Sequence, residues 1–266
     1  GKIEKIRKYK QKEIQGVKMI WIVGGTKDSR DILQKLVEEK REDNIIVSTA
    51  TAYGGELLKK YTSDETKNIQ AISEKLNEEQ MKELIKDKNI SLIIDASHPY
   101  AINVSNSVIK VTEELGVKYV RFERKMLDYG TENVVKFDTL EEINDYVRQF
   151  EGKNILSTMG SNNLGEIKEM SEKNNLYVRI LPTTASIQKA EELGYLPSKI
   201  IAIQGPVDKI MNVATLKSYK IDYLITKESG ATGGEAEKVE ACKECGVMVL
   251  VLKRPFVPYK NIFNDV

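Results

Sequence analysis

Short apolar runs rich in β-branched residues alternate along the chain with longer segments in which apolar residues recur every three or four positions. In the first half, the short runs predict strands at 19–24, 45–49, 91–95 and 118–122. The longer segments predict helices at 28–40, 66–86 and 101–115. This alternation of strand and helix is typical of a parallel sheet with helices on both faces.

The second half repeats the pattern. It predicts strands at 154–158, 176–181, 199–203, 223–226 and 247–252, and helices at 184–192, 207–218 and 235–244. The sequence therefore predicts an α/β protein of two Rossmann-like, doubly wound parallel-sheet domains with a cleft between them. The polar stretch 125–132 marks the boundary, so we expect domains at 19–124 and 125–266 and a separate extension at 1–18.

Charge is unevenly distributed along the 266 residues. Residues 1–18 carry seven basic and two acidic side chains, which leaves the remainder at −4 within a total of +1. A mildly acidic body gives no general attraction to nucleic acid or to a membrane surface. No stretch of about 18 uninterrupted apolar residues and no signal-like segment is present. We expect a cytoplasmic protein, a monomer or weak dimer, that binds neither nucleic acid nor membranes.

Small and polar residues follow the first predicted strand, where a parallel sheet binds its ligands. Gly24 and Gly25 let the backbone approach a ligand closely, and Thr26 and Asp28 stand where a helix begins. Exposed N–H groups at a helix N-terminus favour an anion such as a pyrophosphate. A tight structural turn capped by Asp28 is the alternative.

Hydroxyl residues follow the second predicted strand. Ser48, Thr49 and Thr51 occupy the place where an NAD site usually has the acidic residue that holds the ribose 2′-hydroxyl. Their presence without an acid favours a phosphorylated ribose, hence NADPH rather than NADH. An ordinary Ser/Thr-rich strand end is the alternative.

The only histidine of the chain stands after the predicted strand at 91–95. Asp95, Ser97, His98 and Tyr100 fall within six residues. We assign Asp95 and Ser97 to the cofactor site and His98 and Tyr100 to catalysis. A structural histidine and a helix-capping Asp95 are the alternatives.

Two further polar clusters follow strands of the second half. Gly205, which we assign to the cofactor site, lies in Gln204-Gly-Pro206, and Lys227, Ser229 and Gly230 open a glycine-rich stretch. Lys227 is suited to binding an anion or donating a proton, although such a stretch also forms simple turns.

Cys242 and Cys245 form a C-x-x-C pair late in a predicted helix. That position favours two incidental helix residues over a redox pair, and a zinc site would need two more ligands. No metal site is expected.

Taken together, several motifs resemble the precorrin-6A reductase family of corrin (vitamin B12) biosynthesis, including its cobalt-precorrin-6A branch. The matching pieces, in order along the chain, are Ile22-Val-Gly-Gly-Thr26 with Arg30, Asp95-Ala-Ser-His-Pro-Tyr-Ala101, Arg121-Phe-Glu-Arg124, Gln204-Gly-Pro206, Thr226-Lys-Glu-Ser-Gly230, Glu237-Lys238 and Arg254-Pro255. Ser97 stands where relatives commonly have Thr, Lys125 where many have Pro, and residues 1–18 have no counterpart.

The resemblance implies NADPH-dependent reduction of one C=C bond in a tetrapyrrole that carries many carboxylates. Because such a substrate needs local cations, we expect Arg121, Arg124, Arg179 and Lys227 to bind it together with Ser229 and Gly230. His98 is the first candidate for the proton donor, since its ordinary pKa lies near neutrality, and Lys227 is the second. Direct protonation by solvent is a third possibility.

Three alternatives stay open at this point. They are a non-catalytic NADPH-binding module, a two-lobed tetrapyrrole synthase that uses no nucleotide, and an oxidoreductase working through the cysteine pair. Whether the natural macrocycle contains cobalt, and whether strands cross between the two halves, also stays open.

Overall fold

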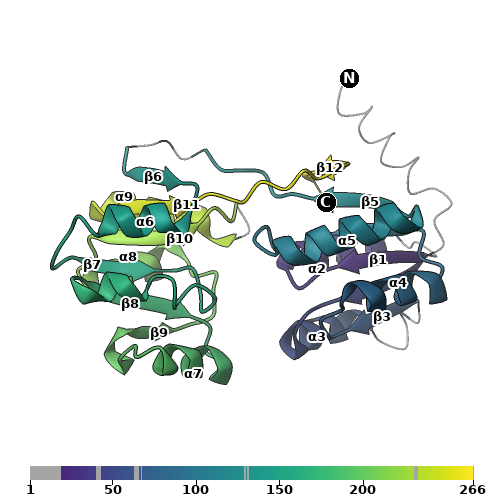
Figure 1. The fold of residues 1–266 in the computed structure, drawn as a ribbon, viewed down its shortest axis with the longest axis horizontal. Helices are drawn as coiled ribbons and strands as arrows, with labels where there is room; N and C mark the ends of the chain where they lie inside the picture. Colours follow the sequence, from purple (N-terminus) through teal and green to yellow (C-terminus); the bar gives the residue numbers. More distant parts are fainter. Residues whose placement is uncertain are drawn as a thin grey trace. The chain divides into compact units, whose positions relative to one another are not determined.

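A computed structural model describes residues 19–39, 43–62, 66, 68–128, 130, 132–230 and 233–265. The chain divides into two compact units (Figure 1). Unit 1 runs to Glu123 and takes in the residues from Phe256 onward, and unit 2 is Arg124–Pro255. The expected second domain, 125–266, therefore differs at its end, because the last residues join the first sheet. The basic extension 1–18 lies outside the described residues.

Unit 1 contains one six-stranded sheet with the order β3-β2-β1-β4-β5-β12, in which every neighbouring pair is parallel. Its strands are β1 (Met19–Val23), β2 (Asn44–Ser48), β3 (Ile69–Ile72), β4 (Leu92–Asp95), β5 (Lys118–Phe122) and β12 (Ile262–Phe263). Its helices are α2 (Lys27–Glu38), α3 (Ala52–Leu58), α4 (Glu78–Asp87) and α5 (Ile102–Leu115), with the 3-10 turn η1 (Lys59–Tyr61). The strand β12 lies beside β5 in the sixth position (Figure 1).

Unit 2 repeats this arrangement with the order β9-β8-β7-β10-β11-β6, again parallel throughout. Its strands are β6 (Val134–Phe137), β7 (Asn154–Ser157), β8 (Asn175–Ile180), β9 (Ile200–Ala202), β10 (Tyr223–Lys227) and β11 (Met248–Leu252). Its helices are α6 (Leu140–Val147), α7 (Thr184–Glu192), α8 (Lys209–Ser218) and α9 (Glu235–Cys245), with the 3-10 turns η3 (Lys168–Glu172) and η4 (Pro197–Lys199). Unit 1 has the Rossmann order, and unit 2 has it with β6, its first strand along the chain, in the sixth position, so the predicted fold class is confirmed. The cleft expected between the domains stays a prediction.

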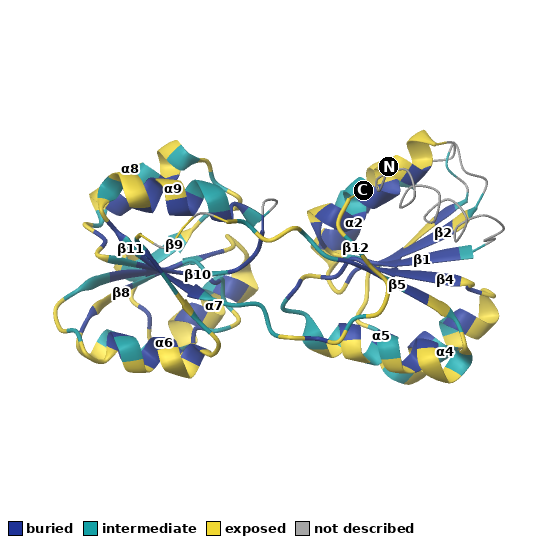
Figure 2. Ribbon diagram, turned by 90° about the horizontal axis from the view of Figure 1, so that it is seen from above, coloured by how far each residue is buried: buried dark blue, intermediate teal, exposed yellow. Residues whose placement is uncertain are grey.

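Helices cover both faces of each sheet (Figure 2). In unit 1, α2 and α3 pack on one face and α4 and α5 on the other, each over its own buried apolar cluster. In unit 2, α6 and α7 cover one face, and α8 and α9 the other. The strands in the middle of each sheet are buried on both sides, which explains their nearly continuous apolar sequences.

Side-chain caps fix where several helices begin. Thr26, Asn77 and Thr139 each form a capping box with the residue three positions later, at the starts of α2, α4 and α6. Glycines in the left-handed conformation end α5 and α9, at Gly116 and Gly246. Of these signals, the Thr26 capping box places the loop that follows β1.

The main error of the sequence prediction is the helix expected at 66–86. Its first part is the strand β3, and only Glu78–Asp87 is helical. Ile69 and Ile72 are spaced like residues on one face of a helix, but Ile69–Ile72 adds an edge strand beside β2. The pattern also missed α3, β6, α6 and β12. The strands β6 and β12 are too short to show a clear period, whereas α6 does show helical spacing, at Leu140, Ile143 and Val147.

Candidate functional site

The carboxyl edge of the unit 1 sheet brings together the loops after β1 and β4. The strand order reverses between these two neighbours, which is the position where open parallel sheets bind ligands. The Thr26 hydroxyl donates to the Ala96 carbonyl at 2.8 Å and accepts from the Ser29 N–H at 3.1 Å. Thr26 thus fixes the start of α2 against the loop that follows β4.

Two glycines precede this threonine. A Cβ on Gly24 would lie 2.9 Å from Ser29 Oγ, whereas the space beside Gly25, at a φ of +95°, is open. No side chain therefore covers the backbone just before α2, and the positive φ of Gly25 is one that suits glycine. Asp28 is buried in the first turn of α2, where a carboxylate stabilises the helix N-terminus.

The three hydroxyl residues after β2 have different surroundings. Ser48 is buried and its Oγ accepts from Trp21 Nε1 at 2.8 Å. Thr49 is buried and donates to the Thr51 carbonyl at 3.1 Å. Thr51 is exposed and caps α3 by accepting from the Gly54 N–H. Of the three, Thr51 is the one whose side chain an outside ligand can reach.

Asp95 lies at the centre of a buried polar network. Its Oδ1 accepts from Arg121 Nη1 at 2.8 Å and from the Ser97 N–H at 3.0 Å. Its Oδ2 accepts from the Ser105 hydroxyl at 2.7 Å and from the Tyr119 hydroxyl at 2.9 Å. Burial, followed by the nearby Asp95 charge, raises the pKa of Tyr119, so this hydroxyl stays a donor. Asp95 holds the loop at Ser97 from inside and has no exposed surface.

Arg121 is also fully buried, which differs from the expectation that it binds the substrate. It stands directly beside Asp95 in the parallel pair of β4 and β5. Its Nε donates to Glu123 at 2.7 Å, and the Tyr259 ring lies 4.6 Å from its Cζ. Burial alone would lower the pKa of Arg121, but Asp95 and Glu123 outweigh that effect and raise it. Arg121 is a structural cation.

His98 is exposed at the same edge, next to the buried Ser97. Its Nδ1 accepts from the Tyr100 N–H at 3.2 Å, and the two rings are 5.8 Å apart. An Nδ1 that accepts a hydrogen bond leaves the proton of a neutral imidazole on Nε2. The sequence prediction that His98 and Tyr100 lie together is matched by this geometry, whereas their roles stay predictions.

In unit 2, the loop after β10 is held by acidic side chains. Glu235, at the start of α9, accepts from the N–H groups of Ser229 and Gly230 at 2.9 and 2.7 Å. Glu228 accepts from Lys136 Nζ at 3.0 Å, and its carbonyl accepts from Arg254 Nε at 2.9 Å. The backbone donors of Ser229 and Gly230 are therefore already bonded, which differs from a loop that cradles an anion.

Arg124 and Arg254 interlock at this loop. Arg124 Nη1 donates to the Ser229 carbonyl at 2.8 Å, and Arg254 Nη1 donates to the Arg124 carbonyl at 3.0 Å. Gly230 adopts a φ of +72°, and a Cβ there would lie 2.8 Å from Arg254 Nη2. Arg124 thus fixes the loop, and this contact leaves its proposed part in substrate binding untested.

Lys227 and Arg179, which the sequence grouped as substrate cations, lie on opposite faces of the unit 2 sheet. Thr226, next to Lys227, bonds to Lys238 of α9, so alternation along β10 points Lys227 to the face covered by α6. Arg179 donates to Asn212 of α8 at 2.7 Å. Burial lowers the pKa of Lys227, with Glu166 opposing it, and burial lowers that of Arg179 to about 10.

Lys238 is a buried cation that belongs to a family-like motif but to which the sequence assigned no role. Its Nζ donates to the Thr226 hydroxyl at 2.7 Å. Burial, reinforced by the Arg179 charge, lowers its pKa to about 8. A signal was available, because Glu235, Lys238, Val239 and Cys242 follow the spacing of one buried helix face.

The cysteine pair lies on the same helix without a disulfide. Cys242 is fully buried, and burial raises the pKa of its thiol to about 12. A reactive thiol needs a lowered pKa and access, so this geometry favours two helix-packing residues.

Metal-ligand clusters and membrane-spanning helices are both absent from the described ranges. No group of three or more His, Cys, Asp or Glu residues could hold a metal ion there. Across the same residues, no helix has both the length and the apolar character needed to cross a membrane.

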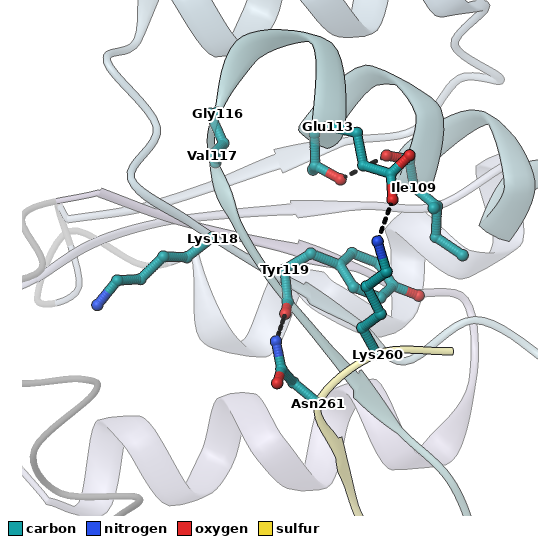
Figure 3. Close-up of a pocket in the computed structure, with 9 residues that line it drawn as sticks. Ile109, Glu113, Gly116, Val117, Lys118, Tyr119, Lys260 and Asn261 are labelled. Carbon is teal, nitrogen blue, oxygen red and sulfur yellow. Dashed lines mark hydrogen bonds and ion pairs between the residues drawn. The ribbon is translucent and has the colours of Figure 1, made fainter. Parts of the chain in front are cut away.

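A pocket of about 280 Å³ lies at the other end of the unit 1 sheet (Figure 3). It is lined by the end of α5, the start of β5 and the segment before β12, where Lys260 pairs with Glu113 at 2.5 Å. It is therefore remote from the carboxyl edge. Gly205, assigned to the cofactor from sequence, lies exposed after β9, the edge strand of unit 2.

Comparisons with known proteins agree with one another. Residues 19–266 match the family model of the precorrin-6x reductase CbiJ/CobK. The cobalt-precorrin-6A reductase of Methanocaldococcus jannaschii is 34% identical over 92% of this chain and 94% of that protein, and that of Methanococcus maripaludis 33% over 93% and 95%. The solved structure of CobK precorrin-6A reductase superposes with a TM-score of 0.73 at 18% identity, over 92% of this chain and 91% of that one.

Proposed function

The chain belongs to the precorrin-6x reductase (CbiJ/CobK) family, and on that premise we propose that it uses NADPH to reduce a C=C bond of cobalt-precorrin-6A. Family membership makes the protein a reductase of cobalamin biosynthesis. The cobalt-containing substrate is favoured because the two methanogen relatives are cobalt-precorrin-6A reductases.

The observation that carries the proposal is the carboxyl edge of unit 1. Gly24 and Gly25 carry no side chain just before the N-terminus of a twelve-residue helix, beside the strand-order reversal. The Gly24 N–H donates to the Ser48 carbonyl and the Thr26 N–H to Ser29 Oγ, so the attraction for a pyrophosphate comes from the helix field and from the open space beside Gly25. The open space beside Gly25 is room that a larger side chain would fill.

The preference for NADPH over NADH rests on the loop after β2. Thr51 is the exposed hydroxyl there and would face the 2′-phosphate, whereas the Ser48 and Thr49 side chains support the loop from within. No acidic residue lies at 48–54 to repel a phosphate. Bound NADPH would supply the hydride.

For the proton we propose His98, which reaches solvent at this edge and has its Nδ1 held by the Tyr100 N–H. Because a neutral imidazole is too weak an acid, the proton would come from the imidazolium form of His98, and Nε2 is the nitrogen that does not contact the Tyr100 N–H. Asp95 and Ser97 act by positioning, since both are buried in the network behind the histidine. Lys227 stays the second candidate.

The test is an assay of NADPH oxidation with cobalt-loaded and cobalt-free precorrin-6A side by side, and with NADH replacing NADPH. We expect turnover with NADPH and the cobalt-loaded macrocycle. Gly25→Val should raise the KM for NADPH about tenfold, because its Cβ occupies the open space and strains a positive φ. Cofactor binding without turnover would instead support a non-catalytic nucleotide-binding module.

The role of His98 is tested by His98→Asn in a single turnover. Loss of the proton donor should slow the step and remove its dependence on pH near neutrality. A rate within twofold of the parent protein would exclude His98, and Lys227→Met would then be the next variant.

A further inference from the structure

A half-buried cation, Arg179, and a buried one, Lys238, lie on the face of the unit 2 sheet that α8 and α9 cover. Arg179 projects from β8 and donates to Asn212 Oδ1 at 2.7 Å. Lys238 projects from α9 and donates to the Thr226 hydroxyl at 2.7 Å, at the end of β10. Asn212 is itself fixed by bonds to the carbonyls of Val207 and Asp208, so both cations have neutral, immobile partners.

Neither cation is neutralised by an ion pair. Across the described residues, no carboxylate oxygen lies within 4 Å of Arg179 or Lys238. Glu235, followed by Cys242 and Glu237 of the same helix, favours the charged form of Lys238 from farther away. One oxygen of Glu235 is already committed to the N–H groups of Ser229 and Gly230.

The surroundings make this positive charge costly. Burial and the charge of Arg179 both disfavour a protonated Lys238. The lysine also lies close to the start of α9, where the helix field disfavours a cation. Proteins rarely bury uncompensated charge unless a ligand or partner compensates it.

The neighbourhood also offers apolar contact. Leu181 follows Arg179 by two residues, and Met211 precedes Asn212 on α8. Both side chains are exposed, at 45% and 47%. A ligand with an apolar plane and anionic edges would use both kinds of surface.

We propose that Arg179 and Lys238 form a carboxylate-binding site for the tetrapyrrole, in which Arg179 binds the carboxylate and Lys238 adds a second positive charge. Lys227 lies on the opposite face of the sheet, so it is not part of this site. The inference rests on the proposed function for the identity of the ligand and goes beyond it by assigning this pair of residues.

The experiment measures binding of uroporphyrin, a tetrapyrrole with eight carboxylates, to the full-length chain by porphyrin fluorescence. Arg179→Met and Lys238→Met should each weaken binding at least about tenfold, as expected when one partner of a buried charge pair is removed. Lys243→Met is the matched control, because Lys243 lies on the same helix but is exposed. Its affinity should stay within twofold of the parent protein.

A second arm uses the unaltered protein, so it does not depend on a variant that folds. Affinity for uroporphyrin should fall as the pH rises from about 7 to about 9.5, because Lys238 loses its proton in that range. Lys238→Met should remove most of this pH dependence, and Lys238→Arg should restore affinity at the higher pH.

Two outcomes would overturn the site. The first is binding by Lys238→Met within twofold of the parent protein. The second is a loss of NADP⁺ affinity in place of uroporphyrin affinity, which would assign the cations to a phosphate. Lack of turnover with cobalt-precorrin-6A would overturn the proposed function but not the site. The site is tested by uroporphyrin binding alone.

Discussion

The two units share one strand order but handle buried charge at the carboxyl edge differently. In unit 1, the buried Asp95 is paired with the buried Arg121 at 2.8 Å. In unit 2, Glu228 is paired with Lys136, yet Lys238 and Arg179 keep a positive charge that no described carboxylate neutralises within ion-pair distance. The buried charges of unit 1 therefore stabilise one another, whereas Arg179 and Lys238 of unit 2 have neutral hydrogen-bond partners.

The largest expected effect comes from breaking the unit 1 pair. Arg121→Met leaves the buried Asp95 without its cation and should lower the free energy of unfolding by about 3–5 kcal/mol. Trp21, the single tryptophan, lies in the core of unit 1, so its fluorescence during urea unfolding reports this unit. Lys110→Met, at an exposed ion pair of the same unit, should cost under about 1 kcal/mol. Equal losses for the two variants would show that Asp95 needs no internal cation.

The next effect tests the opposite behaviour in unit 2. Because the folded state lowers the pKa of Lys238 to about 8, the unfolded chain binds the proton more tightly. Stability should therefore rise with pH between about 8 and about 10.5, by up to about 3 kcal/mol from this group. Calorimetry of Lys238→Met and Lys243→Met as a function of pH isolates this contribution. The rise of the free energy of unfolding with pH should be lost in Lys238→Met and kept in Lys243→Met. If the rise is unchanged in Lys238→Met, Lys238 is not the costly buried charge that distinguishes unit 2 from unit 1.

The smallest effect sharpens the account of unit 1. The Tyr259 ring lies against the Arg121 guanidinium, so Tyr259→Leu should cost about 1–2 kcal/mol by Trp21 fluorescence. Tyr259→Phe keeps the ring and should cost less. If the two substitutions cost the same, the hydroxyl and not the ring contact would be what matters.

Much of the fold was predictable from the sequence because buried parallel strands are long apolar runs. Ile20 to Val23 and Val249 to Val251 are clear examples. The edge strands could not be predicted in this way, because β3 mixes exposed and buried positions and β12 has only two residues. Which sheet an edge strand joins depends on long-range pairing, as the return of β12 to β5 shows.

The candidate site was predicted in its loops but less well in its side chains. Gly24, Thr26 and His98 do gather at one sheet edge, because strand ends in a parallel sheet share an edge. Arg121 was expected to bind the substrate, because a motif does not show which neighbour a side chain meets. Its neighbour in the sheet is Asp95. Lys238 was missed because a lysine on a helix usually faces solvent.

The position of β12 has a consequence for how the protein is made. All six strands of unit 2 lie within Arg124–Pro255, whereas unit 1 needs Phe256–Val266 to complete its sheet. During synthesis on a ribosome, the chain emerges from its N-terminus and domains fold as their residues appear. The unit that begins first is therefore completed by residues that follow the whole of unit 2, and the second unit can be complete before the first.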